Sequence, residues 1–131
     1  MEARILGWMT HQYRADGYLF WIVNKWYHPR MDESDTFFPD YSTRNGNGMP
    51  GDGILMYPGE KSIWPSIKLA NCRDAEEVYE YLKMVSRLAG GKAADEISRS
   101  IVSSLTSFTR DPAKIRVARR RLAEIIESRI R

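Results

Sequence analysis

Polar and aromatic residues follow the most apolar segment of the chain, a position at which many enzymes contact a ligand. Residues 18–23 read Tyr-Leu-Phe-Trp-Ile-Val, and Asn24 and Trp26 come just after them. An apolar run without alternation predicts a β-strand that is covered on both faces, as in a parallel sheet or a barrel. In barrel enzymes, residues at the carboxyl ends of such strands contact the ligand. Asn24 and Trp26 are therefore candidate ligand-binding residues.

Two further candidates flank a second, shorter apolar segment at residues 53–57. Asp52 stands between two glycines, and its carboxylate can accept hydrogen bonds from a ligand, but a turn explains the residue equally well. Tyr57 ends the segment, which predicts a short strand closed by a turn. Its ring suits the wall of a binding site and the protein core equally well.

Residue types that hold metals or form disulfide bonds are scarce in this sequence. Cys72 is the one cysteine, which excludes a disulfide framework within the chain. His11 and His28 are too few and too far apart to suggest a metal site, and no zinc or iron–sulfur spacing occurs. The sequence therefore predicts neither a metal nor another cofactor.

The net charge of +3 comes largely from the end of the chain. Its arginines are Arg116, Arg119, Arg120, Arg121, Arg129 and Arg131. A basic tail is one mark of a nucleic-acid-binding protein. However, Glu124 and Glu127 interleave with the arginines at a spacing that predicts ion pairs within one helix. A solvated helix face is thus the favoured interpretation, and binding to nucleic acid is the weaker alternative.

The first half of the chain predicts short elements around a long loop. Apolar spacing predicts a helix over residues 3–13, with Ile5, Trp8 and Met9 on one face. Residues 28–53 are rich in proline and glycine, and a loop of that length usually serves as a lid or a binding wall. Residues 66–69 predict another extended segment.

The second half predicts three helices. Asn71 is the expected N-cap of the first helix, Gly90-Gly91 end it, and Asp111-Pro112 open the third. The residues expected to face the core are Val78, Tyr81, Leu82, Val85, Leu88 and Ala89 in the first helix, Ile97, Ile101, Leu105 and Phe108 in the second, and Ile115, Ala118, Leu122, Ile125 and Ile126 in the third. A strand that is buried on both faces needs neighbours which so few strands cannot supply, so the pattern alone indicates part of a larger fold.

Several short motifs, in a fixed order, carry a family resemblance. They are Gly51-Asp52-Gly53, Tyr57-Pro58-Gly59, Pro65-Ser66, and Arg73-Asp74 followed by Tyr79-Glu80-Tyr81-Leu82. Together they resemble the carboxy-terminal part of glycoside hydrolase family 123 and of the broader domain of unknown function 4091. Residues 17–26 are similar to the family's last barrel strand. Ala75, Val78 and Lys68 stand where the family has glycine, aspartate and arginine.

The resemblance implies an α/β fold, with this chain as the C-terminal fragment of a (β/α)8 barrel. One buried strand and short extended segments would precede three helices, which makes the chain helix-rich (α+β) if it is taken alone. Residues 1–89 would form the end of the barrel, with the last strand, the long loop and the closing helix. Residues 90–131 would form a C-terminal helical hairpin.

The family is associated with removal of β-linked N-acetylgalactosamine, in which the substrate's own acetamido oxygen attacks the anomeric carbon. An Asp-Glu pair on an earlier barrel strand orients that group and acts as general acid and base. Two Asp-Glu pairs occur in this chain, but neither stands in the family's motif context. Asp32-Glu33 lies in the long loop, and Asp95-Glu96 is expected to start a helix, where carboxylates complement the dipole. No catalytic residue is therefore predicted here.

A sugar subsite is what the resemblance leaves for this chain. Trp26 would stack on a pyranose ring, Asn24 would bond to a hydroxyl, and Asp52 and Tyr57 would complete the wall. The expected partners are a carbohydrate and either the missing N-terminal barrel portion or another copy of the chain. The alternative is a non-catalytic module for sugar binding or assembly. The first residues predict neither a signal peptide nor a membrane span, which leaves the compartment of a larger protein open.

Overall fold

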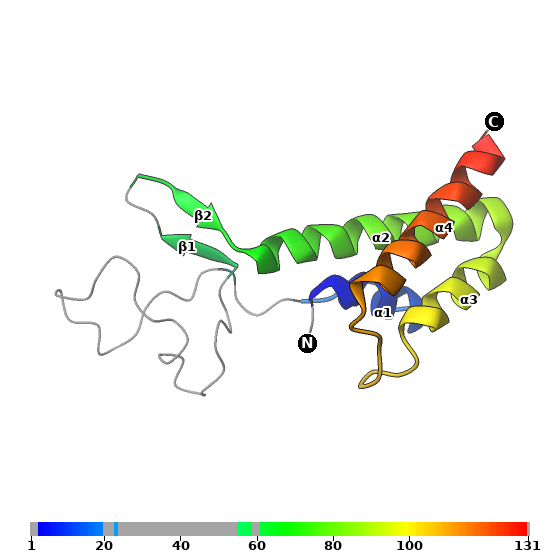
Figure 1. Ribbon diagram of the computed structural model, residues 1–131, viewed down its shortest axis with the longest axis horizontal. Coiled ribbons are helices and arrows are strands. Elements are labelled where there is room, and N and C mark those ends of the chain that lie inside the picture. The colour runs from blue at the N-terminus through cyan, green and yellow to red at the C-terminus, as the bar shows by residue number, and fades with distance from the viewer. Residues whose placement is uncertain (1–2, 20–22, 24–54, 59–60, 131) are drawn as a thin grey trace. The chain divides into compact units, whose positions relative to one another are not determined.

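The computed structural model describes residues 3–19, 23, 55–58 and 61–130 (Figure 1). It is rich in helix and contains one small antiparallel sheet. In chain order the elements are the 3-10 helix η1 Ala3–Ile5, α1 Leu6–Gln12, β1 Met56–Pro58, β2 Ile63–Pro65, α2 Ile67–Ala89, α3 Gly91–Ile101 and α4 Pro112–Ile130. Within the described part of the chain, no helix is long and apolar enough to cross a membrane.

The chain divides into two compact units. The first, Met1–Tyr18 with Asn71–Arg131, is called the helical unit here, and the second, Leu19–Ala70, is called the strand unit. The predicted division after residue 89 follows a different criterion, the extent of the family resemblance, and stays a prediction. Within the helical unit, residues on both sides of position 89 share one core.

The first helix, predicted over residues 3–13, is confirmed as η1 followed by α1. Ile5 and Trp8 are completely buried and Met9 is nearly so. Gly7 faces the backbone of α2 so closely that an added Cβ would overlap the carbonyl oxygen of Ala75. A glycine is needed at this point because any side chain would push α1 and α2 apart.

The start of α2 differs from the prediction. The helix begins at Ile67, and the Ser66 hydroxyl accepts a hydrogen bond of 3.2 Å from the Leu69 N–H, as an N-cap residue does. The predicted cap at Asn71 and the predicted extended segment at 66–69 are therefore wrong. Two polar residues able to cap lie five positions apart, and the upstream one is used.

The core-facing stripe predicted on α2 is largely confirmed. Val78, Leu82 and Val85 are buried, and Tyr81 and Ala89 pack against them. Leu88, however, is 38% exposed. The helix ends before Gly90 as predicted, and Gly90 has a φ of 92°, a conformation that residues with a side chain rarely adopt.

The second predicted helix is shorter than its apolar spacing suggested. It ends at Ile101, and Val102 is extended and forms a β-bridge with Phe108. Leu105 is 59% exposed in the connecting loop, so its predicted place in the core is wrong. Phe108 packs against the core from this loop rather than from a helix.

The third helix follows the prediction closely. The Asp111 carboxylate accepts a hydrogen bond of 2.8 Å from the Ala113 N–H, and Pro112 is the first helical residue. The predicted stripe is confirmed, with Ile115, Ala118, Leu122 and Ile126 buried and Ile125 packed against them.

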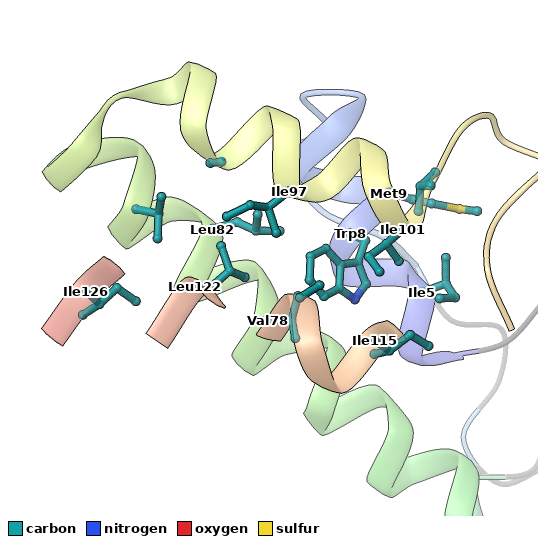
Figure 2. Packing of buried hydrophobic residues seen from close by; sticks show 14 residues of the cluster. Ile5, Trp8, Met9, Val78, Leu82, Ile97, Ile101, Ile115, Leu122 and Ile126 are labelled. Atoms are coloured by element: carbon teal, nitrogen blue, oxygen red, sulfur yellow. The ribbon is translucent and has the colours of Figure 1, made fainter. Parts of the chain in front are cut away.

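One apolar cluster joins the four helices of the helical unit (Figure 2). Its buried members are Ile5, Trp8, Met9, Val78, Leu82, Val85, Ala94, Ile97, Ile101, Val102, Ile115, Ala118, Leu122 and Ile126. Figure 2 shows the Trp8 ring among side chains from the longer helices. The Trp8 indole Nε1 is buried and has no hydrogen-bond partner among the described residues. Helix α1 is thus surrounded by the core rather than attached to its surface.

The apolar run at 18–23 is described only at Tyr18, Leu19 and Val23, and none of these is in a strand. Leu19 is 85% exposed and Val23 39%, so the predicted burial is wrong at these two residues. Residues 20–22 lie outside the described part.

A short hairpin forms the described sheet. β1 confirms the end of the strand predicted at 53–57, whose first two residues lie outside the described part, and β2 was not predicted. The strands are antiparallel, with Met56 opposite Pro65 and Tyr57 opposite Trp64. The helix-rich half of the fold-class prediction is confirmed. The predicted barrel is not tested by the described residues and stays a prediction.

The contact at Gly7 gives the first testable prediction. Gly7→Ala should lower the free energy of unfolding by about 1–3 kcal/mol, because the added methyl group forces α1 away from α2. Chemical denaturation followed by circular dichroism measures the change. Gly91→Ala is the matched control, since a Cβ there meets nothing within 4 Å. Equal stability of the two variants would contradict this account of the α1–α2 contact.

Candidate functional site

Of the four residues predicted to bind ligand, the structure places one. Asn24, Trp26 and Asp52 lie outside the described residues. Tyr57 lies in β1, is partly buried, and stands directly opposite Trp64 of β2. Whether the four come together therefore stays a prediction, and Tyr57 is the starting point for a site in the strand unit.

Tyr57 and Trp64 form a cross-strand aromatic pair. Residues directly opposite each other in an antiparallel ladder project from the same face of the sheet, so the two side chains start from adjacent positions. Trp64 is 48% exposed, a high value for a side chain with so much apolar surface. Neighbouring aromatic rings of which one is open to solvent are suited to stacking on the apolar face of a sugar ring.

Sequence reasoning missed Trp64. Its segment, Ile63-Trp64-Pro65, holds just three strand residues, and the proline that ends it argues against a strand. The available signal was the pairing of two short apolar stretches around the Pro58-Gly59 turn, which is typical of a hairpin.

A charged cluster in the helical unit was also missed. The Arg14 Nη2 donates to both carboxylate oxygens of Asp95, at 2.8 and 2.7 Å. The His11 Nε2 lies 3.1 Å from the Asp95 Oδ1. A carboxylate can only accept, so the neutral imidazole carries its proton on Nε2. Asp95 therefore joins α3 to the end of α1, a role different from the dipole complement predicted for it.

The protonation states in this cluster follow from burial and charge. Burial is the main cause that lowers the pKa of His11, and the Arg14 charge acts in the same direction, while Asp95 opposes them. For Asp95, burial acts to raise the pKa, but hydrogen bonds and positive charge from Arg14, with help from His11, outweigh it and lower the pKa. The cluster thus holds a neutral histidine beside an ionised carboxylate and an arginine.

Arg14 occupies an unusual backbone conformation for its residue type. Its φ is 55°, in the left-handed region that favours glycine. The Arg14 N–H donates to the His11 carbonyl at 3.2 Å and the Ala15 N–H to the Thr10 carbonyl at 3.0 Å, which is the Schellman pattern of a helix end. A left-handed arginine costs on the order of 1 kcal/mol. The bidentate ion pair with Asp95 is the contact that offsets this cost.

The basic face of α4 is arranged differently from the prediction. No ion pair joins its arginines to Glu124 or Glu127 in the described part of the chain. Arg119 instead forms an ion pair with Glu77 of α2 and stacks over the Tyr81 ring, 5.6 Å from its centroid. The predicted pairing within the helix is not found among the described residues, and Arg131 lies outside them. The described residues contain no group of His, Cys, Asp and Glu side chains that could hold a metal.

Comparison with known protein families identifies the family of this chain. A family model described as glycoside hydrolase 123, catalytic domain, matches residues 1–85. The chain belongs to the glycoside hydrolase 123 family. This confirms the resemblance seen in the motifs and supports an action on carbohydrate. A comparison with curated proteins gave no match.

The glycoside hydrolase 123 match covers a definite part of the structure. It takes in α1, both strands with Tyr57 and Trp64, and α2 as far as Val85. Helices α3 and α4 follow it, so the Asp95-Glu96 pair lies beyond the match. Of the two Asp-Glu pairs in the sequence, Asp32-Glu33 falls within the match but outside the described residues.

The lowered pKa of His11 predicts how stability depends on pH. In the unfolded chain this histidine has its ordinary pKa of 6.5, so the unfolded state binds more protons than the folded state as the pH falls below about 7. The free energy of unfolding should therefore fall between pH 7.5 and 5, as measured by urea denaturation. The lowered pKa of Asp95 also decreases the free energy of unfolding as the pH falls, but only at more acidic pH, below the ordinary aspartate pKa of 3.8.

The variants His11→Gln and His28→Gln separate the causes of this pH dependence. His11→Gln should flatten the change in unfolding free energy between pH 7.5 and 5, whatever its effect on stability at pH 7. His28→Gln removes the other histidine of the chain, so a slope that flattens in this variant instead would assign the pH dependence to His28. A slope that persists in His11→Gln would contradict the assignment to His11.

Proposed function

We propose that this chain is the C-terminal segment of a glycoside hydrolase 123 barrel, and that it forms one wall of the sugar site without catalysing the reaction alone. The observation that carries the proposal is the family match over residues 1–85. In the intact enzyme the reaction would be hydrolysis of a β-N-acetylgalactosaminide, with the acid and base supplied by an Asp-Glu pair on an earlier strand.

Exposed apolar side chains in the strand unit support the proposal that another surface packs against it. Leu19 is 85% exposed, Ile63 54% and Ile67 81%. Scattered exposed apolar residues are ordinary, but three at this level in the strand unit are consistent with cover by another surface. The rest of the barrel, or failing that another copy of the chain, would supply it.

The aromatic pair supports the proposed role in binding. Tyr57 and Trp64 lie within the matched residues and present neighbouring rings of which Trp64 is half exposed. In the proposal they form a stacking surface for a pyranose ring, and Asn24, Trp26 and Asp52 add polar and aromatic contacts. Aromatic stacking with a few directed hydrogen bonds is the usual way in which proteins hold a sugar.

The contacts of Asp95 argue against a catalytic role for the Asp95-Glu96 pair. Both of its carboxylate oxygens accept hydrogen bonds from Arg14, and Oδ1 is also in contact with His11. A carboxylate in these contacts is not free to orient a substrate group. Its lowered pKa also disfavours any role as an acid for this residue.

A turnover assay tests the proposal that the chain alone is not catalytic. The purified chain should release no nitrophenol from p-nitrophenyl N-acetyl-β-galactosaminide above the rate of the buffer, because the acid and base are expected elsewhere. Turnover that disappears in Glu33→Gln would overturn this part of the proposal and move the catalytic role to the Asp32-Glu33 pair.

A binding measurement tests the proposed aromatic wall. Trp64→Ala should weaken the binding of N-acetylgalactosamine to the chain by roughly tenfold, because stacking on an aromatic ring contributes on the order of 1 kcal/mol. Titration followed by NMR chemical shifts measures the dissociation constant. Ile63→Ala is the matched control, since neighbouring residues of a strand project from opposite faces of the sheet. Equal affinities of the two variants would remove Trp64 from the site.

A further inference from the structure

A cleft in the helical unit plays no part in the proposed sugar wall. It has a pocket of about 150 Å³ and an open groove of about 340 Å³, which adjoin each other at Thr10, Asp16 and Tyr79. We call it the α1–α2 cleft, because residues of α1, of the following turn and of α2 line it. All its lining residues belong to the helical unit, whereas Tyr57 and Trp64 belong to the strand unit.

The pocket end of the α1–α2 cleft offers hydrogen-bond acceptors. Asp16 and Glu76 bring two carboxylates to its lining. The Tyr18 hydroxyl donates to the Glu76 Oε1 at 2.8 Å. Burial, followed by the hydrogen bond and charge of Glu76, raises the pKa of Tyr18, so the phenol keeps its proton and holds that carboxylate in place. The remaining carboxylate lone pairs suit a ligand that presents hydroxyl donors.

The groove end offers hydrogen-bond donors and positive charge. Arg14, Lys83 and Arg87 line it, against the single carboxylate of Asp16. Arg14 is held in place by Asp95 and is still 61% exposed, and Lys83 pairs with Glu80 at 3.1 Å. Arg87 has no ion-pair partner in the described part of the chain. The neighbouring His11 is neutral at pH 7 and adds no charge.

This division of charge along the cleft selects a class of ligand. Acceptors at one end match hydroxyl groups. At the other end Arg87, together with Lys83 and Arg14, which are each paired with a carboxylate, matches an acidic group. Tyr18 and Tyr79 add aromatic surface to the pocket. Membership of a glycoside hydrolase family favours a saccharide among ligands with this combination of groups. We propose that the α1–α2 cleft binds a saccharide with an acidic substituent, with its hydroxyls toward Asp16 and Glu76 and its anionic group toward Arg87, Lys83 and Arg14.

The proposed cleft site is independent of the proposed sugar wall. Asp16 and Gly17 precede the apolar run 18–23, whereas Asn24 and Trp26 follow it. The residues that line the α1–α2 cleft belong to the helical unit, and Tyr57 and Trp64 belong to the strand unit, so each proposal rests on its own residues. Failure of one proposal leaves the other standing.

Titration of the full chain with three probes tests the cleft site. N-acetylgalactosamine 6-sulfate should bind at least about tenfold more tightly than N-acetylgalactosamine, because a charge-assisted hydrogen bond is added. It should also bind more tightly than inorganic sulfate, which makes no contact with the carboxylate end. Isothermal titration at low ionic strength measures the three dissociation constants. Equal affinity for the sulfated and the unsulfated sugar, or for the sulfated sugar and sulfate alone, would overturn the proposal.

Variants assign the binding to the cleft. Arg87→Gln should weaken the binding of the sulfated sugar roughly tenfold and leave that of the unsulfated sugar nearly unchanged. Arg120→Gln, which removes the same charge from an exposed position on α4, should have no effect. Asp16→Asn should weaken both sugars, since it removes an acceptor. Trp64→Ala should leave this binding intact, which separates it from the sugar wall. If Arg87→Gln and Arg120→Gln weaken binding equally, the interaction is general attraction to a basic protein and the proposal fails.

Discussion

The helical unit depends on the burial of one short helix, α1, among three longer ones. An isolated helix of seven residues is far too short to be stable in water, so packing must supply its stability. Ile5 and Trp8 supply it by their complete burial, and Gly7 lets the backbone of α2 approach. The Ser98 hydroxyl adds a buried hydrogen bond of 3.1 Å to the Trp8 carbonyl. The first residues of the chain and its last helices are thus parts of one core.

The electrostatic contacts of the helical unit reinforce this arrangement at its edges. Asp95 ties α3 to Arg14 and His11 at the end of α1, and Glu77 ties α2 to Arg119 of α4. Partly exposed contacts of this kind each contribute on the order of 1 kcal/mol, so they fix the relative position of helices that the apolar cluster already holds together. Arg14 is left-handed where the Schellman hydrogen bonds close α1, and from this position its side chain pairs with Asp95. Packing sets the fold here, and charge adjusts it.

Periodicity made part of this structure predictable from sequence. Helix α4 has an Asp-Pro start and a regular apolar stripe, and both were found where they were predicted. Helix α2 starts earlier than predicted because Ser66 and Asn71 can both act as caps, and local sequence does not rank them. Leu105 fits the spacing of α3 by coincidence, since the serine-rich segment that carries it turns into a bridge between Val102 and Phe108.

The candidate sites were harder to predict, because they depend on contacts between distant residues. Asp95 is separated from His11 by 84 positions and from Arg14 by 81, so no local pattern connects them. The pairing of Tyr57 with Trp64 depends on the register of a hairpin with just three residues in each strand. The family match confirms the family resemblance and supports an action on carbohydrate. The resemblance did not indicate the α1–α2 cleft, whose carboxylates and cations come from α1, the following turn and α2.

The unpaired indole of Trp8 has an optical consequence. Its ring is fully buried in an apolar cluster, and its N–H meets no acceptor among the described residues. Such an indole emits fluorescence at shorter wavelength than one in water, because no polar surroundings relax around its excited state. Trp64, half exposed in the strand unit, emits from a wetter environment. Trp8 in the helical unit and Trp64 in the strand unit therefore emit from different environments.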